Sequence, residues 1–269
     1  MKKIILLACL SVSLYSCSRN AVTGRNQLSL FPESEIQQMA ATEYRTFLTQ
    51  NKVVGATGSK DAEMVRRVGQ RITSAINTYY TNKGQANILE GYQWEYNLVD
   101  SKDVNAWCMP GGKIVVYTGL LPITQNEAAL AVVMGHEVMH ALARHGSERM
   151  SQGMLQQVGQ VALSVALANK TAETQNIFMS AYGIGANVGL VLPFSRRDEY
   201  EADHFGLTFA AMAGYNPQEA IPLWERMEKA GGGNKPPEFL STHPSEGNRI
   251  ERLKKQMPEA LRYYKPMNK

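Results

Sequence analysis

The feature that most constrains this chain is the run His136-Glu137-Val138-Met139-His140, which reads H-E-x-x-H. Residues i and i+4 of an α-helix share one face, so the imidazoles of His136 and His140 can reach the same metal ion. Glu137 lies beside them, where its carboxylate can hold a water on that metal. This arrangement is typical of a zinc protease, which needs one further protein ligand. The alternative is a core helix with two incidental histidines, but its buried polar groups would then lack partners.

The residues around the motif predict a buried helix. Thr124 and Glu127 have the spacing of a capping box, which places the start of the helix after Thr124. Residues 128–134 are apolar on all sides, as expected of a helix inside the core. Gly146 is the predicted C-terminal stop, and His145 just before it is interpreted as an incidental surface residue, as is His204.

The N-terminus has the pattern of a leader. Lys2 and Lys3 precede the apolar stretch Ile4 to Leu14, which is too short to span a bilayer. The following Leu14-Tyr15-Ser16-Cys17 resembles a bacterial lipoprotein cleavage box, so we expect cleavage before Cys17 and a lipid on its sulfur. The alternative is an ordinary secretory leader with an incidental cysteine.

These features predict three segments: a signal peptide at 1–16, a polar tether at 17–32 and a zinc metallopeptidase domain at 33–269. A lipid on Cys17 would anchor the mature protein to a membrane without spanning it. We expect it to face the periplasm of the bacterial cell envelope, with the inner and outer membranes both possible.

Composition excludes one class of partner. The 269 residues are 44% hydrophobic and 19% charged, as in globular proteins, and the formal net charge is +4. No basic run has the length that nucleic-acid binding requires, so we expect no nucleic-acid partner. The oligomeric state is left open.

Periodicity predicts an α+β fold, in which helices accompany a small β-sheet. Helices are expected at 33–50 and 61–80, a strand at 92–99, and a hairpin of strands 105–109 and 113–118. An edge strand beside the motif helix can pair with an extended substrate, although ordinary sheet packing fits the pattern equally well.

The stretch Ser151 to Leu192 is rich in apolar and small residues. Neither half reaches the roughly 18 apolar residues of a membrane span. We predict two soluble helices here, with a membrane hairpin as the alternative.

The third metal ligand is sought on a second helix. Ser195 and Asp198 have the spacing of another capping box, and Glu199 and Asp203 then lie on one face of the helix that follows. We predict that Glu199 binds zinc and that Asp203 accepts the free N–H of a ligating histidine. Glu201 is rotated to the opposite side, so its loss is expected to leave zinc binding nearly unchanged.

Four separated motifs carry a family resemblance over most of residues 33–257. They are H-E-x-x-H, S-R-x-x-E-Y-x-A-D-x-x-G at 195–206, T-H-P at 242–244, and N-A-W at 105–107 followed by P-G-G. They resemble the HtpX, BepA and LoiP group of gluzincin endopeptidases, related to the CAAX prenyl proteases. The resemblance implies a mostly α-helical zincin-like metallopeptidase domain with a small β-sheet, and zinc bound by two histidines and a glutamate. It also implies Glu137 as base, and proteolysis of misfolded or envelope proteins.

The same resemblance suggests roles for further residues. Asn105, Ala106 and Trp107 become candidate substrate-binding residues. His243 is the candidate to stabilise the oxyanion, or to occupy the open zinc position at rest; a surface-loop histidine is the alternative. With no clear membrane helices and an end at Lys269, we expect neither the membrane helices of HtpX nor the helical-repeat domain of BepA, and a layout closest to the short lipoprotein LoiP.

Two other classes of function remain open at this stage. One is a zinc-binding lipoprotein chaperone or adaptor that does not cleave its protein partners. The other is a structural lipoprotein without metal. The intact Glu137 favours a zinc endopeptidase with one Zn²⁺ per chain, acting on protein or peptide substrates.

Overall fold

A three-stranded sheet lies at the centre of the fold, in the order β3-β5-β4. The structure is a computed structural model that describes residues 17–55, 57–155, 172–182, 184, 194–231, 237–244 and 248–266. Strand β5 (Lys113–Tyr117) pairs in parallel with β3 (Glu95–Val99) and antiparallel with β4 (Ala106–Met109). Gly111 and Gly112, at φ of 76° and 85°, form the turn between β4 and β5, so the predicted hairpin is confirmed.

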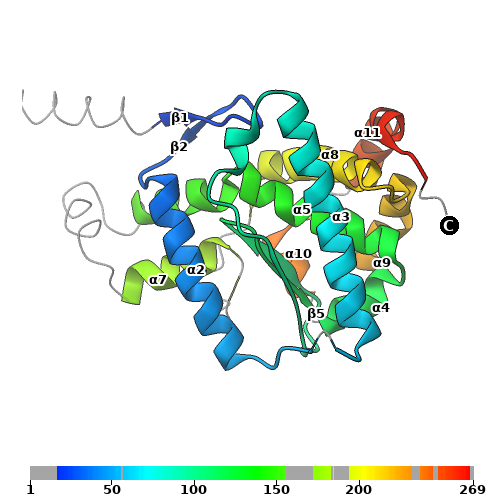
Figure 1. Ribbon diagram of the computed structural model, residues 1–269, viewed down its shortest axis with the longest axis horizontal. Helices are drawn as coiled ribbons and strands as arrows, with labels where there is room; N and C mark the ends of the chain where they lie inside the picture. Colours follow the sequence, from blue (N-terminus) through cyan, green and yellow to red (C-terminus); the bar gives the residue numbers. More distant parts are fainter. Residues whose placement is uncertain are drawn as a thin grey trace, which may run out of the picture.

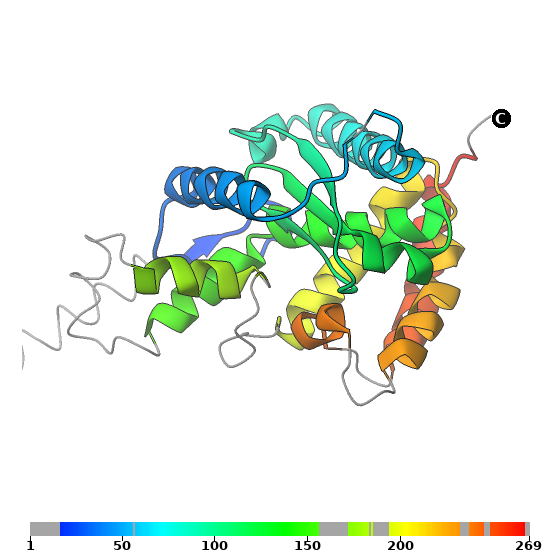
Figure 2. The ribbon, with the colours of Figure 1, turned by 90° about the horizontal axis from the view of Figure 1, so that it is seen from below.

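Helices cover both faces of this sheet, which confirms the predicted α+β class (Figure 1). Figure 2 shows α2 (Glu33–Gln50) and α7 (Ala172–Ala181) on one side of the strands and α3 (Lys60–Asn82) on the other. The strands alternate accordingly: Leu98 belongs to the cluster that includes α3, and the adjacent Val99 to the cluster that includes α2. The helices predicted at 33–50 and 61–80 are therefore confirmed.

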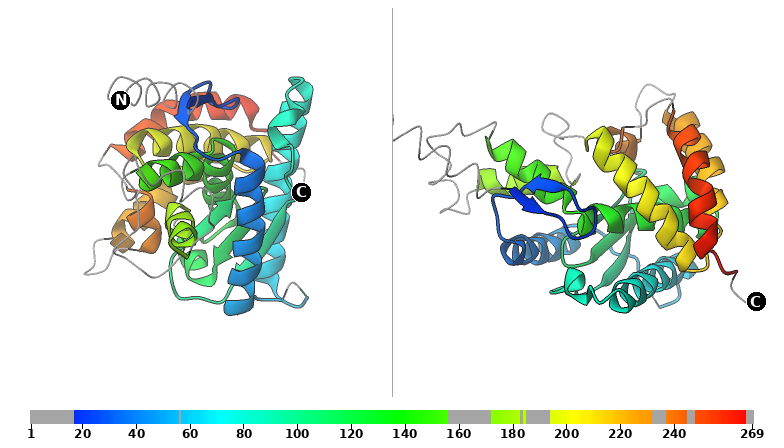
Figure 3. Two further views of the ribbon diagram at one scale, coloured as in Figure 1. Left: turned by 90° about the vertical axis from the view of Figure 1, so that its left-hand side faces the viewer. Right: turned by 90° about the horizontal axis from the view of Figure 1, so that it is seen from above.

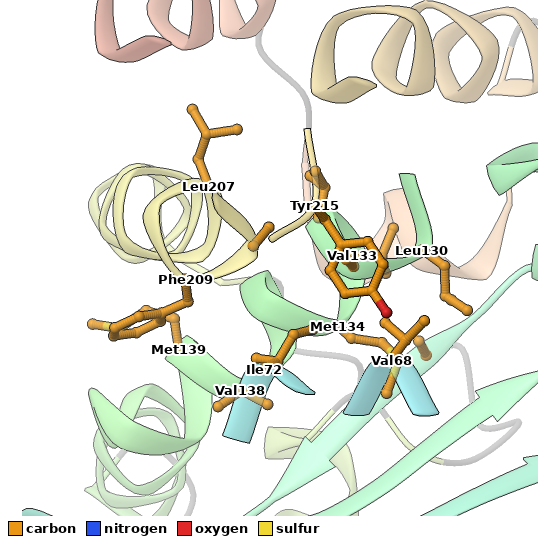
Figure 4. Close-up of a cluster of buried hydrophobic side chains, with 14 of the residues drawn as sticks. Val68, Ile72, Leu130, Val133, Met134, Val138, Met139, Leu207, Phe209 and Tyr215 are labelled. Carbon is orange, nitrogen blue, oxygen red and sulfur yellow. The ribbon is translucent and has the colours of Figure 1, made fainter. Parts of the chain in front are cut away.

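The motif helix, α5 (Glu127–Leu142), runs through the larger of these two clusters. It packs against α3, β4 and α8 (Arg196–Met212). Figure 4 shows its apolar side chains, Val133 and Val138 among them, meeting residues of α3 and α8. The burial of each such side chain stabilises the fold by roughly 1.5–3 kcal/mol. The motif is therefore held on a rigid element.

Both predicted ends of α5 were wrong by a few residues. The cap is Asn126, whose Oδ1 accepts a hydrogen bond from the Ala129 amide at 2.8 Å. Thr124 instead ends the short helix α4 (Leu121–Thr124). At the other end the helix stops at Leu142, and a new helix runs over residues 145–155, so Gly146 lies inside a helix.

The C-terminal part adds helices beside α5 and α8. They are α9 (Ala220–Gly231), the short α10 (Glu238–Thr242) and α11 (Arg249–Tyr263). Single turns of 3-10 helix lie at η1 (Ala86–Leu89), η2 (Thr118–Leu120) and η3 (Pro217–Glu219).

The segment predicted to be a tether is folded. Residues 17–28 form an antiparallel hairpin of β1 (Cys17–Arg19) and β2 (Asn26–Leu28), seen beside α5 in Figure 3. Its polar side chains bind carbonyl groups at the end of α5: Asn20 Nδ2 donates to Leu142 at 3.4 Å and Gln27 Nε2 to Ala143 at 2.7 Å. Helix ends leave such carbonyls without intrahelical partners. The polar residues that suggested a tether therefore attach the hairpin to the end of α5.

The predicted signal peptide at 1–16 and much of the stretch Ser151 to Leu192 lie outside the described residues. In the part of the chain that the structure describes, no helix has the combined length and hydropathy that a membrane crossing requires.

Candidate metal centre

Four side chains from three segments converge at one point inside the fold. His136 and His140 come from successive turns of α5, and their Nε2 atoms lie 3.1 Å apart. Glu199, on α8, places Oε1 3.3 Å from His140 Nε2 and Oε2 3.6 Å from His136 Nε2. His243, directly after α10, places Nδ1 2.9 Å from Glu199 Oε1. These residues are all buried and together could hold a metal ion.

The close packing of α5 on α8 brings the two halves of this cluster together. A Cβ at Gly206 of α8 would lie 2.7 Å from the backbone nitrogen of His136, and one at Gly135 of α5 would lie 2.7 Å from the Gly206 carbonyl oxygen. The capping box predicted for Ser195 and Asp198 is present and starts α8 just before Glu199. Glycine at the crossing thus sets the distance between the helix backbones.

Asp203 lies against His136, the histidine on the preceding turn of the motif from His140. Its Oδ1 lies 3.0 Å from His136 Nδ1, and Arg249 donates to both carboxylate oxygens, at 2.7 and 2.9 Å. Burial alone would raise the pKa of Asp203, but Arg249 and His136 lower it below its ordinary value. Arg249 stacks on Trp224, with its guanidinium carbon 3.4 Å from the ring centroid. Sequence reasoning missed Arg249, which stands in no local motif.

The donor set fits zinc. A carboxylate accepts hydrogen bonds only, so Asp203 fixes the proton on His136 Nδ1 and leaves a lone pair on Nε2. Burial lowers the pKa of His140 well below its ordinary value, which keeps that ring neutral as well. Two lone pairs and a carboxylate that face one another in a buried space are stabilised by a cation, and this N,N,O set is one that zinc prefers.

Glu137 lies next to the cluster, with a carboxylate that is free to accept a proton. Its Oε1 has no hydrogen-bond partner among the described residues and lies 3.5 Å from His243 Nε2. Burial and the nearby Glu199 raise the pKa of Glu137 well above its ordinary value. Burial lowers the pKa of His243 to about 4, so this imidazole is neutral at pH 7.

Aromatic rings close the centre from solvent. Phe194 stacks on His140 with ring centroids 3.9 Å apart, and Phe239 stacks on His243 at 4.4 Å. His243 is 2% exposed, so the alternative of a surface-loop histidine is wrong. Among the described residues, His136, His140, Glu199 and His243 are each no more than 4% exposed.

His145 was wrongly expected at the surface. It is fully buried, with Nδ1 2.9 Å from His140 Nδ1 and Nε2 2.8 Å from Glu201 Oε2. The helix break at Arg144, whose φ is 56°, turns the chain so that His145 packs back onto α5. The side chain of Glu201 is itself only 14% exposed. His204 is partly exposed, near Glu259.

The side chains of Asn105, Ala106 and Trp107 do not form a substrate-binding surface. All three are buried, and the Trp107 ring packs edge-on against Phe47 at 4.9 Å between centroids. Alternate residues of β4 face the two cores, which leaves the backbone of this edge strand as the group that can meet a substrate.

The helical domain and the histidine–carboxylate cluster define the class of zinc metallopeptidases. Comparison with known proteins gives the family: residues 60–257 match the model of peptidase family M48, and the chain belongs to that family. Zinc is the metal of this family, so the predicted cofactor is confirmed.

Two kinds of relative are similar to this chain. Metalloendopeptidase OMA1, mitochondrial, from Bos taurus is 32% identical over 254 residues, which are 92% of this chain and 47% of the relative. Mitochondrial metalloendopeptidase OMA1 from Arabidopsis thaliana is 40% identical over 66% of this chain and 35% of its own length. The Beta-barrel assembly-enhancing protease of Escherichia coli is 26% identical over 70% of this chain and 37% of its own length. The chain thus spans between a third and a half of these relatives.

Proposed function

We propose that this protein is a zinc-dependent endopeptidase of the bacterial cell envelope that cleaves misfolded or envelope proteins. The observation that carries the proposal is the buried cluster of His136, His140 and Glu199 with Glu137 beside it. A site built only to hold a structural metal needs no additional carboxylate with a raised pKa next to its ligands.

In the proposed reaction His136, His140 and Glu199 hold the zinc, and Asp203 orients His136. Zinc held by these residues would supply a Lewis acid, which would lower the pKa of a water and polarise the peptide carbonyl. Glu137 accepts the proton of the attacking water and passes it to the leaving amine. The carboxylate is buried beside Glu199, which raises its pKa above the ordinary value and makes it a stronger proton acceptor than an exposed glutamate.

We assign two successive positions to His243. In the closed conformation its Nδ1 faces the cluster, 3.2 Å from His136 Nε2, where it takes the place of a substrate. When the segment after α10 opens, the imidazole becomes available as a hydrogen-bond donor to the oxyanion.

We propose the edge of β4 as the place where an extended peptide binds. Strand β4 contacts α5 and lies at one edge of the sheet. A peptide can add to such an edge through backbone hydrogen bonds. Val104 lies two residues before β4, and its carbonyl oxygen accepts a hydrogen bond at 3.1 Å from the backbone amide of Phe239 in α10. Opening of α10 would therefore free both the edge and the metal centre.

We further propose that Cys17 carries a lipid that attaches the protein to a membrane, as in short lipoproteins of the LoiP type. The leader pattern of residues 1–16 supports this assignment. In the Cys17→Ala variant the protein should be released from membranes into the soluble fraction. Fractionation with a high-salt wash measures this, with Cys108→Ala as the control that keeps the anchor. A variant that remains in the membrane fraction would disprove the lipid anchor.

The proposed activity is tested by digestion of casein with the wild type and with Glu137→Gln. The substitution keeps the shape of the side chain and the three ligands but removes the proton acceptor, so zinc content should be retained and nearly all turnover lost. A metal chelator should likewise abolish the activity of the wild type. Undiminished turnover in Glu137→Gln would remove Glu137 from the mechanism, and a zinc-loaded wild type that cleaves nothing would favour a zinc-binding adaptor.

A further inference from the structure

A continuous line of polar contacts joins the metal centre to the N-terminal hairpin. It runs from His140 through His145 to Glu201, and from Glu201 Oε1 to Arg25 Nε at 3.1 Å. Arg25 lies between β1 and β2, more than a hundred residues before its partners. The proposed reaction uses none of His145, Glu201 or Arg25.

This line sets the tautomer of His140. Glu201 is an acceptor, so the His145 proton lies on Nε2 and His145 Nδ1 presents a lone pair to His140 Nδ1. His140 therefore carries its own proton on Nδ1 and directs the lone pair of Nε2 at the cluster. A partner of this kind orients a metal-bound imidazole and raises its basicity.

Arg25 is the positively charged residue at the end of this line that lies away from the metal centre. Its Nη1 and Nη2 bind the two oxygens of Glu148 at 3.0 and 2.8 Å, and Nη2 also lies 3.2 Å from Asp198 Oδ1. The Arg25 side chain is only 14% exposed. Three carboxylates gathered in so little water repel one another unless a positive charge compensates them.

The group His145, Asp198 and Glu201 has the spacing to hold a metal, but the guanidinium of Arg25 already supplies its positive charge. All three Arg25 nitrogens are used, in a geometry that a planar fork satisfies and a lysine ammonium does not. These residues are therefore better explained as support for His140 than as a second metal site.

We propose that Arg25 is a positioning residue for the metal centre, acting through Glu201 and His145 to hold His140 in its zinc-binding tautomer. The N-terminal hairpin is on this account a working part of the peptidase domain. The inference rests on the proposed binding of zinc by His140, but not on the substrate or the location of the protein.

The first test compares zinc affinity in Arg25→Gln and Arg197→Gln. Arg197 is the matched control because it also lies near Glu148 and Asp198, at 3.6 and 4.0 Å, but its side chain is 55% exposed. Within the described part of the chain it forms no ion pair with Glu201. Competition with a chromogenic chelator gives the Kd of the full chain for zinc. Loss of a residue that directly supports a ligand weakens metal binding by roughly 10–100-fold. Arg25 is separated from His140 by Glu201 and His145, so Arg25→Gln should raise the Kd for zinc by less, about 3–10-fold.

Thermal unfolding of the metal-free proteins separates positioning from general stability. If Arg25→Gln does not fold, Arg25→Lys replaces it, since it keeps the charge and loses the fork. Arg25→Gln should weaken zinc binding while Arg197→Gln leaves it unchanged. Co²⁺ substitution gives a second readout, because its visible spectrum reports the ligand geometry directly, and only Arg25→Gln should alter it.

The second test is a double-mutant cycle on zinc affinity with Glu201→Gln. If Arg25 acts through Glu201, the double variant should bind zinc no more weakly than the weaker single variant. Additive losses, or equal zinc affinities of Arg25→Gln and wild type, would overturn the inference while leaving zinc binding intact. A wild type that binds no zinc would overturn the proposed function together with it.

Discussion

In each of the two α5 histidines, the two ring nitrogens have different partners. Nδ1 of His136 faces Asp203, and Nδ1 of His140 faces His145, so both rings turn Nε2 toward Glu199. One partner is an aspartate held by Arg249 and the other a histidine held by Glu201. Two different supports therefore produce the same result, a pair of lone pairs aimed at one point.

The two glutamates of α8 provide a matched pair of substitutions. Glu199→Gln and Glu201→Gln remove the same charge from the same helix, two residues apart. Glu199→Gln should lose most bound zinc and all proteolysis, because a carboxamide is a poor zinc ligand. The sequence alone provided no reason to expect an effect of Glu201, but Glu201 contacts His145, which contacts His140. Glu201→Gln should therefore keep stoichiometric zinc with an affinity lowered by roughly 10-fold, as for the loss of a supporting group. Zinc analysis of both proteins after dialysis measures the difference.

The reverse result would be decisive. Metal retained by Glu199→Gln and lost by Glu201→Gln would contradict both the ligand assignment and the orientation of α8. It would also require His145 and Glu201 to form the metal site.

Some of these residues could be predicted from the sequence and others could not. The spacing within H-E-x-x-H and within Glu199 to Asp203 is local, so helix geometry alone was enough to place them. Arg249 and Arg25 are single charged residues whose partners lie about 46 and 123 to 176 residues away in sequence. No local pattern marks such a residue, and the contact exists only once the fold has formed.

At the scale of elements, the crossing of α5 and α8 decides the geometry of the centre. The sequence predicted both helices, and the cap of α8, from residues near their ends. It placed the end of α5 at Gly146, whereas the helix ends at Leu142. The break depends on Arg144, which adopts a positive φ and whose Nε lies 3.0 Å from a carboxylate oxygen of Glu33 on α2. Tertiary contacts of this kind override local stop signals.

The crossing makes a prediction for Gly206→Ala. The added Cβ would lie 2.7 Å from the His136 nitrogen and 2.8 Å from its Cα, and backbone atoms cannot rotate away. The helices must separate, at a cost of about 1–3 kcal/mol as for other overpacked sites, and Glu199 and Asp203 move away from the histidines. The Tm of thermal unfolding should therefore fall, and the Kd for zinc should rise.

Gly55→Ala is the control for this substitution. A Cβ at Gly55 meets nothing within 4 Å, so stability should stay the same or rise slightly. Unchanged zinc binding in Gly206→Ala would show that the close approach of α5 and α8 is not needed for the centre.

At the scale of the whole molecule, the chain closes on itself around the metal centre. The hairpin at residues 17–28 contacts the end of α5, and Arg249 of the C-terminal helix α11 contacts Asp203. The sequence indicated the helical class and the small sheet, but it predicted that residues 17–28 belong to a tether. Short strands with polar residues have the same composition as a loop, so composition alone could not distinguish the two. Because β1 begins at Cys17, a lipid there would hold the peptidase domain close to the membrane surface.

Metal removal should therefore loosen the whole domain. Zinc would join His136 and His140 of α5 to Glu199 of α8, so it binds the folded state and not the unfolded chain. At free zinc about 100 times the Kd this linkage contributes roughly 2.7 kcal/mol. For a domain of this size that corresponds to a Tm shift of about 5–10 °C, at roughly 2–4 °C per kcal/mol.

Scanning calorimetry of the full chain with excess chelator, and again after zinc is restored, measures this shift. Glu199→Gln should melt at one temperature under both conditions, because its site no longer responds to the metal, and Mg²⁺ in place of zinc should leave the wild type at its chelated Tm. The Tm of the wild type should rise only with zinc. An identical Tm of the wild type with chelator and with zinc would mean that the four-residue cluster does not bind the metal, and the assignment of the metal centre would be wrong.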